Sequence, residues 1–161
     1  GWCLYNIFQT QNGGQGYVVK AAAMAETFAG FGWGALLGPD QPNRFRPGNI
    51  MSMPGHVWLS LGACTDGSVV FLHSSPCGVQ IGATPTPQQK QASAALELAS
   101  YYMARYFPLW HQKYPCYQRG IDYLQRSSAL QWRLDGKGAL LDPEGYAALS
   151  PVSILQQLLG D

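Results

Sequence analysis

Two short segments joined by a turn place the tightest constraint on the fold of this chain. Between residues 56 and 61 every second residue is apolar, which is the two-residue period of a strand with one buried face. The Asp-Gly pair at 66–67 favours a turn, because both residues tolerate the positive φ that hairpin loops need. Residues 69–72 are all apolar and lead directly to His73. The sequence therefore predicts an antiparallel hairpin with His56 and His73 on neighbouring strands.

This hairpin carries two of the three histidines of the chain, which makes it the candidate functional segment. Imidazole titrates near neutral pH and can therefore donate or accept a proton during catalysis. The alternative is that His56 and His73 are ordinary strand residues hydrogen-bonded to the backbone. The third histidine, His111, lies between Trp110 and Gln112 and is expected on the surface.

The register of the hairpin decides whether the two imidazole rings can touch. A tight two-residue turn would leave His56 and His73 roughly 13 Å apart along the strands. A six-residue loop at 62–67 would instead set the two residues directly opposite each other. We therefore predict a wide loop or a bulge between Leu61 and Val69, with both rings on the face toward the first helix.

Three segments, in this order, resemble the NlpC-type cell-wall peptidases, a family of papain-like cysteine peptidases. The family pattern is Pro-Gly-Asp before an apolar residue, then His-Val-Gly, then an apolar residue before His, and the matching segments are residues 46–52, 55–62 and 72–76. The resemblance is strongest over about residues 46–81. It departs from the family at Asn49, where Asp is usual, and at Trp58, where Gly is common.

The resemblance implies an α+β, papain-like fold in which helices pack on a small antiparallel sheet. The length of 161 residues suits a single domain, 1–161, large enough to bury a core. Within it we expect helices and the central sheet in residues 1–85 and a helical C-terminal elaboration in residues 86–161.

The resemblance also implies an activity, the hydrolysis of an amide bond in the stem peptides of bacterial peptidoglycan through a thioester. His56 would then be the general base toward a cysteine, and His73 would hold the His56 ring in the productive tautomer. No metal or organic cofactor is implied, and the protein would be secreted or associated with the cell wall. The rival hypotheses are a non-catalytic wall-binding module on the same fold and a cytoplasmic amidase or acyltransferase of the same type.

The nucleophile is the part of the family pattern that this chain does not contain, because the Asp-Cys-Ser-Gly motif is missing. One hypothesis places that motif upstream of Gly1, since residues 2–8 predict a helix with no capping residue ahead of Trp2. A second makes Cys3 a displaced nucleophile, although a cysteine beside Trp2 and Leu4 is more often a buried apolar residue. A third holds that the protein lost its nucleophile and binds without cleaving.

Composition narrows the other classes of function. The net charge of +1 gives no indication of a nucleic-acid partner or an anionic membrane, and no apolar stretch is long enough to span a bilayer. No segment with a charged and then an apolar part opens the chain, so we expect either a removed or omitted secretion signal or a cytoplasmic protein. The four cysteines lack the spacing of a zinc site, and their even number permits disulfides without requiring them; they are Cys3, Cys64, Cys77 and Cys116.

Local patterns predict the remaining elements. We expect helices at residues 18–31, from Thr86 to about Tyr106, at 117–130 and at 152–159, the last capped by Ser150-Pro151 and ended by Gly160. A loop at 38–49 would lead into a short strand at 50–53, and an additional strand is possible at 131–134. A turn is expected at 142–145. Five aromatic residues could line a binding groove, although a satellite core is the preferred interpretation; they are Tyr106, Phe107, Trp110, Tyr114 and Tyr117.

Overall fold

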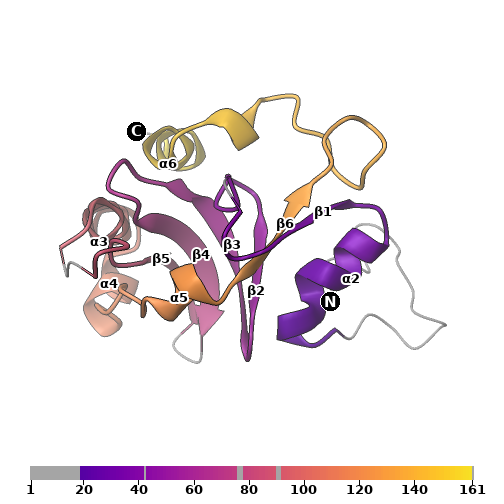
Figure 1. Cartoon of the computed structure of the whole chain (residues 1–161). Coiled ribbons are helices and arrows are strands. Elements are labelled where there is room, and N and C mark those ends of the chain that lie inside the picture. The colour runs from indigo at the N-terminus through magenta and orange to yellow at the C-terminus, as the bar shows by residue number, and fades with distance from the viewer. Residues whose placement is uncertain (1–18, 42, 76–77, 90–91, 161) are drawn as a thin grey trace.

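The computed structural model describes residues 19–41, 43–75, 78–89 and 92–160, and these form an α+β fold around one six-stranded antiparallel sheet (Figure 1). The strand order is β1-β6-β2-β3-β4-β5. The strands are β1 (Gly34–Leu37), β2 (Ile50–Met53), β3 (His56–Ala63), β4 (Val69–Ser75), β5 (Gly78–Ala83) and β6 (Ser128–Trp132). The helices are α2 (Met24–Gly30), α3 (Ala94–Tyr106), α4 (Pro108–Lys113), α5 (Asp122–Gln125) and α6 (Pro151–Leu159), with 3-10 turns η1 (Ala21–Ala23) and η2 (Tyr146–Ala148).

The position of β6 corrects the expectation that residues 86–161 are a helical elaboration. This strand lies inside the sheet, between β1 and β2, and pairs antiparallel with both. The predicted helix at 117–130 is also wrong, since only the four residues of α5 are helical there. Ala129 packs with one core cluster and Leu130 with another, on the opposite side of the sheet. This alternation is that of a strand with two buried faces, which explains why the apolar residues here do not form a helix.

The two faces of the sheet are buried by different elements. One face carries Leu61, Val70 and Ile81, which pack against α3 and α6. Leu72 pairs with Leu59, and Leu59 pairs with Ile50, so these three side chains lie on the same face of the sheet. Helix α2 packs on Ile50 and Leu130 and therefore covers this face as well. The opposite face, called the second face below, carries a separate core cluster to which α5 contributes Leu124. The residues that the strands contribute to this cluster are Met51, Met53, Trp58, Val69, Phe71 and Ala129. His56 and His73 belong to this second face.

The start of α3 differs from the prediction, which placed its cap at Thr86. The amide of Gln89 donates to the carbonyl of Thr86 at 2.8 Å, so this segment is a turn. The helix begins after Ser93, whose Oγ accepts from the amide of Leu96. The amide of Ala94 donates to a carboxylate oxygen of Asp66 at 2.8 Å, so the hairpin turn completes the cap of α3. A cap supplied by a residue so distant in sequence cannot be recognised from a local pattern.

Other elements agree with the sequence patterns. The strand at 50–53, the turn at 142–145 and the end of α3 at Tyr106 are confirmed. So is α6, with Ser150 as its N-cap and Gly160 in the left-handed conformation at its end. The predicted helix at 18–31 is shorter, because α2 begins only at Met24, after η1. The predicted helix at residues 2–8 lies outside the described residues, as does Cys3.

Candidate functional site

His56 and His73 lie in direct contact on the second face of the sheet. Nε2 of His56 is 3.2 Å from Nδ1 of His73, and the rings meet edge to face, with centroids 5.3 Å apart. The side chain of His73 is buried, while that of His56 is half-buried and reaches the surface. The inner ring is thus held by its surroundings, and the outer ring can be approached from solvent.

A bulge in β3 produces this contact. Ser60 lies opposite Phe71, but the next paired residue on β3 is Gly62, opposite Val70, so the register shifts between Ser60 and Gly62. The predicted bulge is present, but it lies at Leu61, at the near end of the interval from Leu61 to Val69 in which it was expected. The predicted direct opposition of the two histidines is wrong: Leu59 pairs with Leu72, which brings Trp58 rather than His56 opposite His73.

The rings still meet because His56 and His73 are diagonal neighbours on one face. Side chains of diagonal neighbours on an antiparallel pair are within reach of each other when they are long or aromatic. The prediction that both rings face the first helix lies outside the described residues.

Arg119 and Gln80 complete the polar surroundings of His73. Gln80 lies directly opposite His73 on β5. Nη2 of Arg119 is 3.3 Å from Nε2 of His73 and donates to Oε1 of Gln80 at 3.1 Å. The backbone of Arg119 is itself fixed, since its amide donates to the carbonyl of Ala83 at 2.9 Å. Four residues from four segments therefore form one connected polar group, His56–His73–Arg119–Gln80.

Aromatic side chains enclose this polar group on its inner side. The ring of Tyr123, from α5, lies 5.7 Å from the His56 ring and 5.2 Å from the Phe71 ring, between centroids. Phe71 in turn lies 5.2 Å from His73. Trp58, where the resembled family commonly has Gly, is buried beneath them and donates from Nε1 to Oγ of Ser127 at 3.2 Å. The Trp58 indole is therefore part of the hydrophobic core, and the two histidines pack against aromatic side chains.

These surroundings hold both histidines in the neutral form at neutral pH. Burial, the charge of Arg119 and the neighbouring His56 together lower the pKa of His73 to about 4. Burial and the charge of Arg119 also lower the pKa of His56. Burial raises the pKa of the Tyr123 phenol, although a hydrogen bond with Arg119 opposes the shift. In a neutral imidazole one ring nitrogen donates and the other accepts. The groups around the pair therefore decide which of the two histidines donates the hydrogen bond between them.

The contacts of His56 with described residues are with His73 and Tyr123, and neither described cysteine is among them. Cys64 lies eight residues further along, beyond the end of β3, roughly 26 Å away for an extended strand, and packs against the opposite face. Burial raises the pKa of its thiol to about 11. Cys116 is exposed, and its carbonyl accepts from Nη1 of Arg119 at 3.1 Å. Cys3 and Cys77 lie outside the described residues.

His111 is separate from this site and differs from its expected surface position. Its side chain is half-buried, and its Nδ1 contacts the hydroxyl of Tyr117 while the two rings stack. Tyr117 and Tyr106 join the core beneath α3, as the satellite-core interpretation predicts. Trp110 remains partly exposed and lines an apolar pocket with Phe107.

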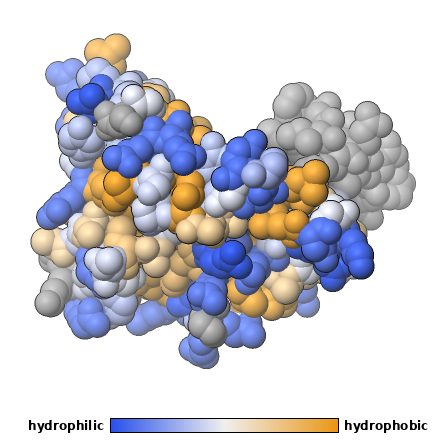
Figure 2. Space-filling view, turned by 90° about the horizontal axis from the view of Figure 1, so that it is seen from above, coloured by the Kyte–Doolittle hydropathy of each residue, from blue (hydrophilic) through white to orange (hydrophobic). Residues whose placement is uncertain are grey.

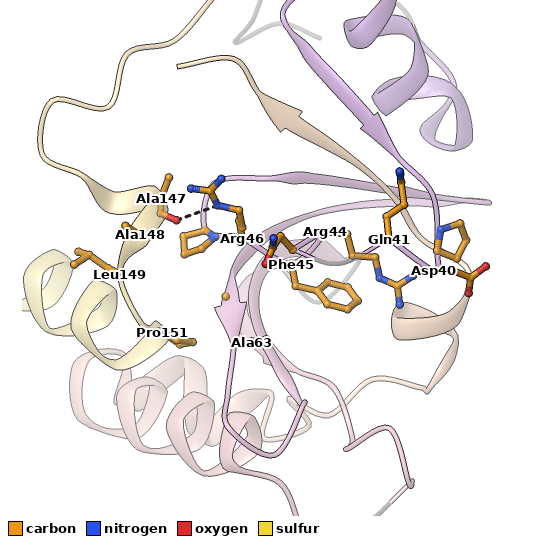
Figure 3. Close-up of a pocket in the computed structure, with 14 residues that line it drawn as sticks. Asp40, Gln41, Arg44, Phe45, Arg46, Ala63, Ala147, Ala148, Leu149 and Pro151 are labelled. Atoms are coloured by element: carbon orange, nitrogen blue, oxygen red, sulfur yellow. Dashed lines mark hydrogen bonds between the residues drawn. The ribbon is translucent and has the colours of Figure 1, made fainter. Parts of the chain in front are cut away.

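The cavity of about 740 Å³ in Figure 3 lies away from the histidines, at the other end of β3. Its wall includes Arg44 and Arg46, which point in different directions, and Nε of Arg46 donates to the carbonyl of Ala147 at 3.4 Å. The chemistry of the two rings is a stronger guide to function than the size of this cavity.

A second, apolar pocket of about 290 Å³ is lined by Leu141 and Leu158, whose side chains are largely exposed. On the face seen from above in Figure 1, apolar side chains lie in patches between hydrophilic ones (Figure 2).

Three residues of the site were not found from the sequence. Gln80 could have been found by extending the β4–β5 register, which pairs it with His73. Arg119 and Tyr123 follow α4 in an irregular segment and in α5, and no local pattern connects them with the hairpin. Only the folded chain brings them to the second face of the sheet.

Comparisons with protein-family models, with curated proteins and with solved structures found no match to this chain. Within the described ranges, no group of three or more His, Cys, Asp or Glu side chains is arranged to hold a metal ion. None of the helices in that part of the chain combines the length and apolar character that crossing a membrane requires.

Proposed function

We propose that this protein is a papain-like cysteine hydrolase of the NlpC type that cleaves an amide bond in the stem peptides of bacterial peptidoglycan. The observation that carries the proposal is the contact between His56 and His73, a neutral pair with one buried and one accessible ring. A neutral base in contact with a group that can orient its ring is what nucleophilic catalysis by a thiol requires, and the pair provides both when the proton of His56 lies on Nε2. The protein would act at the cell wall, outside the cytoplasm.

In the proposed reaction, the proton of a cysteine thiol passes to His56 and the thiolate attacks the carbonyl carbon of the amide. The C–N bond then breaks, the proton on His56 goes to the leaving amine, and a thioester remains. Water hydrolyses the thioester and restores the thiol. His73 acts as a positioning residue, because it contacts His56 and lies behind it in the sheet. The reaction as written uses no metal and no organic cofactor.

The contacts of His56 with described residues are with His73 and Tyr123 and include neither Cys64 nor Cys116, and burial raises the pKa of the Cys64 thiol, so we place the nucleophile outside the described residues. Of Cys3 and Cys77, which both lie outside the described residues, the candidate is Cys3, because the sequence predicts a helix at residues 2–8 but places Cys77 at the end of a strand, where no helix dipole lowers the pKa of a thiol. A cysteine ahead of Gly1 is the alternative source.

The test is digestion of purified peptidoglycan and of soluble muropeptides, followed by mass spectrometry of the products. It uses the chain together with any residues that its gene encodes ahead of Gly1. We expect new amino groups on stem peptides and a loss of roughly a hundredfold or more in His56→Gln. His111→Gln is the matched control and should keep full activity, because His111 lies in a different part of the fold. Cleavage that persists unchanged in His56→Gln would refute the proposal.

A second function is favoured by one observation: the contacts of His56 with described residues include neither described thiol, and burial raises the pKa of Cys64. On that hypothesis the same fold binds peptidoglycan without cleaving it. Binding to the insoluble polymer without product formation, unaffected by Cys3→Ser, would support the binding module over the hydrolase. If Cys3→Ser and His56→Gln instead abolish cleavage equally, Cys3 is the nucleophile.

A further inference from the structure

A chain of hydrogen bonds with a defined direction leads into the histidine pair. Nε2 of Gln80 donates to the carbonyl of Tyr114 at 3.0 Å, which turns its Oε1 toward Arg119. Oε1 accepts from Nη2 of Arg119 at 3.1 Å. The same Nη2 lies 3.3 Å from Nε2 of His73. The remaining carbonyl contacts of Arg119, to Cys116 and Gln118, hold its other terminal nitrogen in place.

The chemistry of these groups fixes the direction of each bond. A guanidinium has donors only, so Nε2 of His73 has to be the acceptor of the bond from Arg119. A neutral imidazole then carries its proton on the other nitrogen, Nδ1, which is the atom that faces His56. Nδ1 of His73 therefore donates to Nε2 of His56. The single proton of neutral His56 is left on its Nδ1.

We infer that Arg119 is a positioning residue that sets the tautomers of both histidines, with the proton on Nδ1 in each ring. This inference extends the proposed function, because it states which form of the pair Arg119 favours. The lowered pKa values of His56 and His73 agree with it, since the charge of Arg119 contributes to both. Gln80 supports Arg119 from the other side.

The inference has a consequence for the proposed reaction. If His56 takes a thiol proton at Nδ1, its other proton has to lie on Nε2 and be donated to Nδ1 of His73. The proton of His73 then has to be on Nε2, where it faces the donor Nη2 of Arg119. Two donors at that distance repel each other. Arg119 therefore holds the pair in an arrangement in which Nδ1 of His56 cannot act as a base, and it has to leave His73 before His56 can.

The test is nuclear magnetic resonance of the full chain labelled with ¹⁵N in histidine, at pH 7. Couplings between ring protons and ring nitrogens show which nitrogen of each imidazole carries the proton. With three histidines, the variants His56→Gln and His111→Gln assign every signal. The key variant is Arg119→Met, which removes the donors and keeps an unbranched, apolar side-chain stem. Arg126→Met is the matched control, because Arg126 is exposed at the end of α5 and loses the same charge.

We expect His73 to be protonated on Nδ1 and bare on Nε2 in the unsubstituted protein and in Arg126→Met. In Arg119→Met the Nε2-protonated form should become populated, while the His111 signals stay unchanged. A proton on Nε2 of His73 in the unsubstituted protein would overturn the inference, and this result is obtained even if Arg119→Met does not fold. An unchanged tautomer in folded Arg119→Met would overturn it as well. Because neither result depends on hydrolysis, the inference and the proposed function can fail separately.

Discussion

His56 and His73 share one face of the sheet only because β3 contains a bulge between Ser60 and Gly62. Beyond the bulge, toward the turn, Gly62 pairs with Val70 and Ala63 with Val69. If that register continued without the bulge, His73 would lie opposite Leu59, whose side chain points to the other face. The rings would then be on opposite sides of the sheet. The bulge is therefore the structural element on which the histidine pair depends.

Gly62→Ala tests this dependence. Gly62 has a φ of +119°, and a Cβ there would lie 3.1 Å from the ring of Pro151 and 3.3 Å from that of Pro47. We expect the free energy of unfolding to fall by about 2–3 kcal/mol, because backbone strain and crowding add together. The control is Gly136→Ala, where φ is +80° with nothing within 4 Å, and the loss should be about 1 kcal/mol. Urea unfolding measures both, and equal losses would contradict the crowding at the bulge.

His73 should make the stability of the protein depend on pH between about 4 and 6.5. Its pKa in the folded protein, about 4, is below the value of 6.5 for an unfolded chain, so the unfolded state binds the extra proton first. The contribution is complete above pH 6.5 and is lost as the pH falls toward 4. We expect the free energy of unfolding to drop by roughly 3 kcal/mol from this residue.

The measurement is urea unfolding at pH 7 and pH 4.5 for the unsubstituted protein and for His73→Gln. The variant cannot take up the proton, so its pH dependence should be smaller. Both proteins contain the same carboxylates, so the difference between their pH dependences gives the contribution of His73. Identical pH dependence in the two proteins would mean that His73 keeps an ordinary pKa in the fold.

Asp66, the acidic residue of the hairpin turn, should contribute strongly to stability. One carboxylate oxygen accepts from the amide of Ser68 at 3.0 Å and from its hydroxyl, and the other accepts from the amide of Ala94 at 2.8 Å. Burial raises the pKa of this carboxyl, but the hydrogen bonds outweigh burial and leave the pKa lowered. Asp66→Ala should reduce the free energy of unfolding by about 2 kcal/mol, because it removes a turn and a helix cap together.

Asp135→Ala is the control for this prediction. Its carboxylate accepts only a local bond, from the amide of Lys137 at 3.0 Å, in an exposed loop. We expect a loss of no more than about 0.5 kcal/mol there. Thermal or urea unfolding compares the two variants, and a loss in Asp66→Ala as small as in Asp135→Ala would show that α3 does not need this cap.

The two described cysteines should differ in reactivity toward an alkylating reagent. At pH 8 a thiol with a pKa of about 11 is ionised to about one part in a thousand, and Cys64 is half-buried as well. Cys116 is exposed. Iodoacetamide should therefore modify Cys116 at least about tenfold faster than Cys64 in the folded protein. Peptide mapping by mass spectrometry measures the rate of alkylation at each cysteine. The difference between the two rates should vanish in urea. Equal rates in the folded protein would contradict the half-buried position of Cys64.

The sequence by itself determined the hairpin and the identity of the two histidines, and it required a wide loop or a bulge if the two rings were to meet. These follow from alternation, an Asp-Gly pair and the reach of the strands, all of which are local properties of residues 56–73. The sequence also determined α6, whose cap, proline and terminal glycine lie within one short segment. Local chemistry of this kind can be recognised before the chain is folded.

Tertiary structure decided the remainder. The sequence located only the end of β6, through the possible strand at 131–134, and assigned residues 128–130 to a helix. Ala129 and Leu130 become strand residues only when two neighbouring strands hydrogen-bond to them. The cap of α3 by Asp66 and the contact of Arg119 with His73 join residues 28 and 46 positions apart. The direction of the bond between His56 and His73 depends on that second contact, so the sequence showed the two rings but not which nitrogens carry their protons. A charged donor near a neutral imidazole acts through space, and its position is set by the path of the folded backbone.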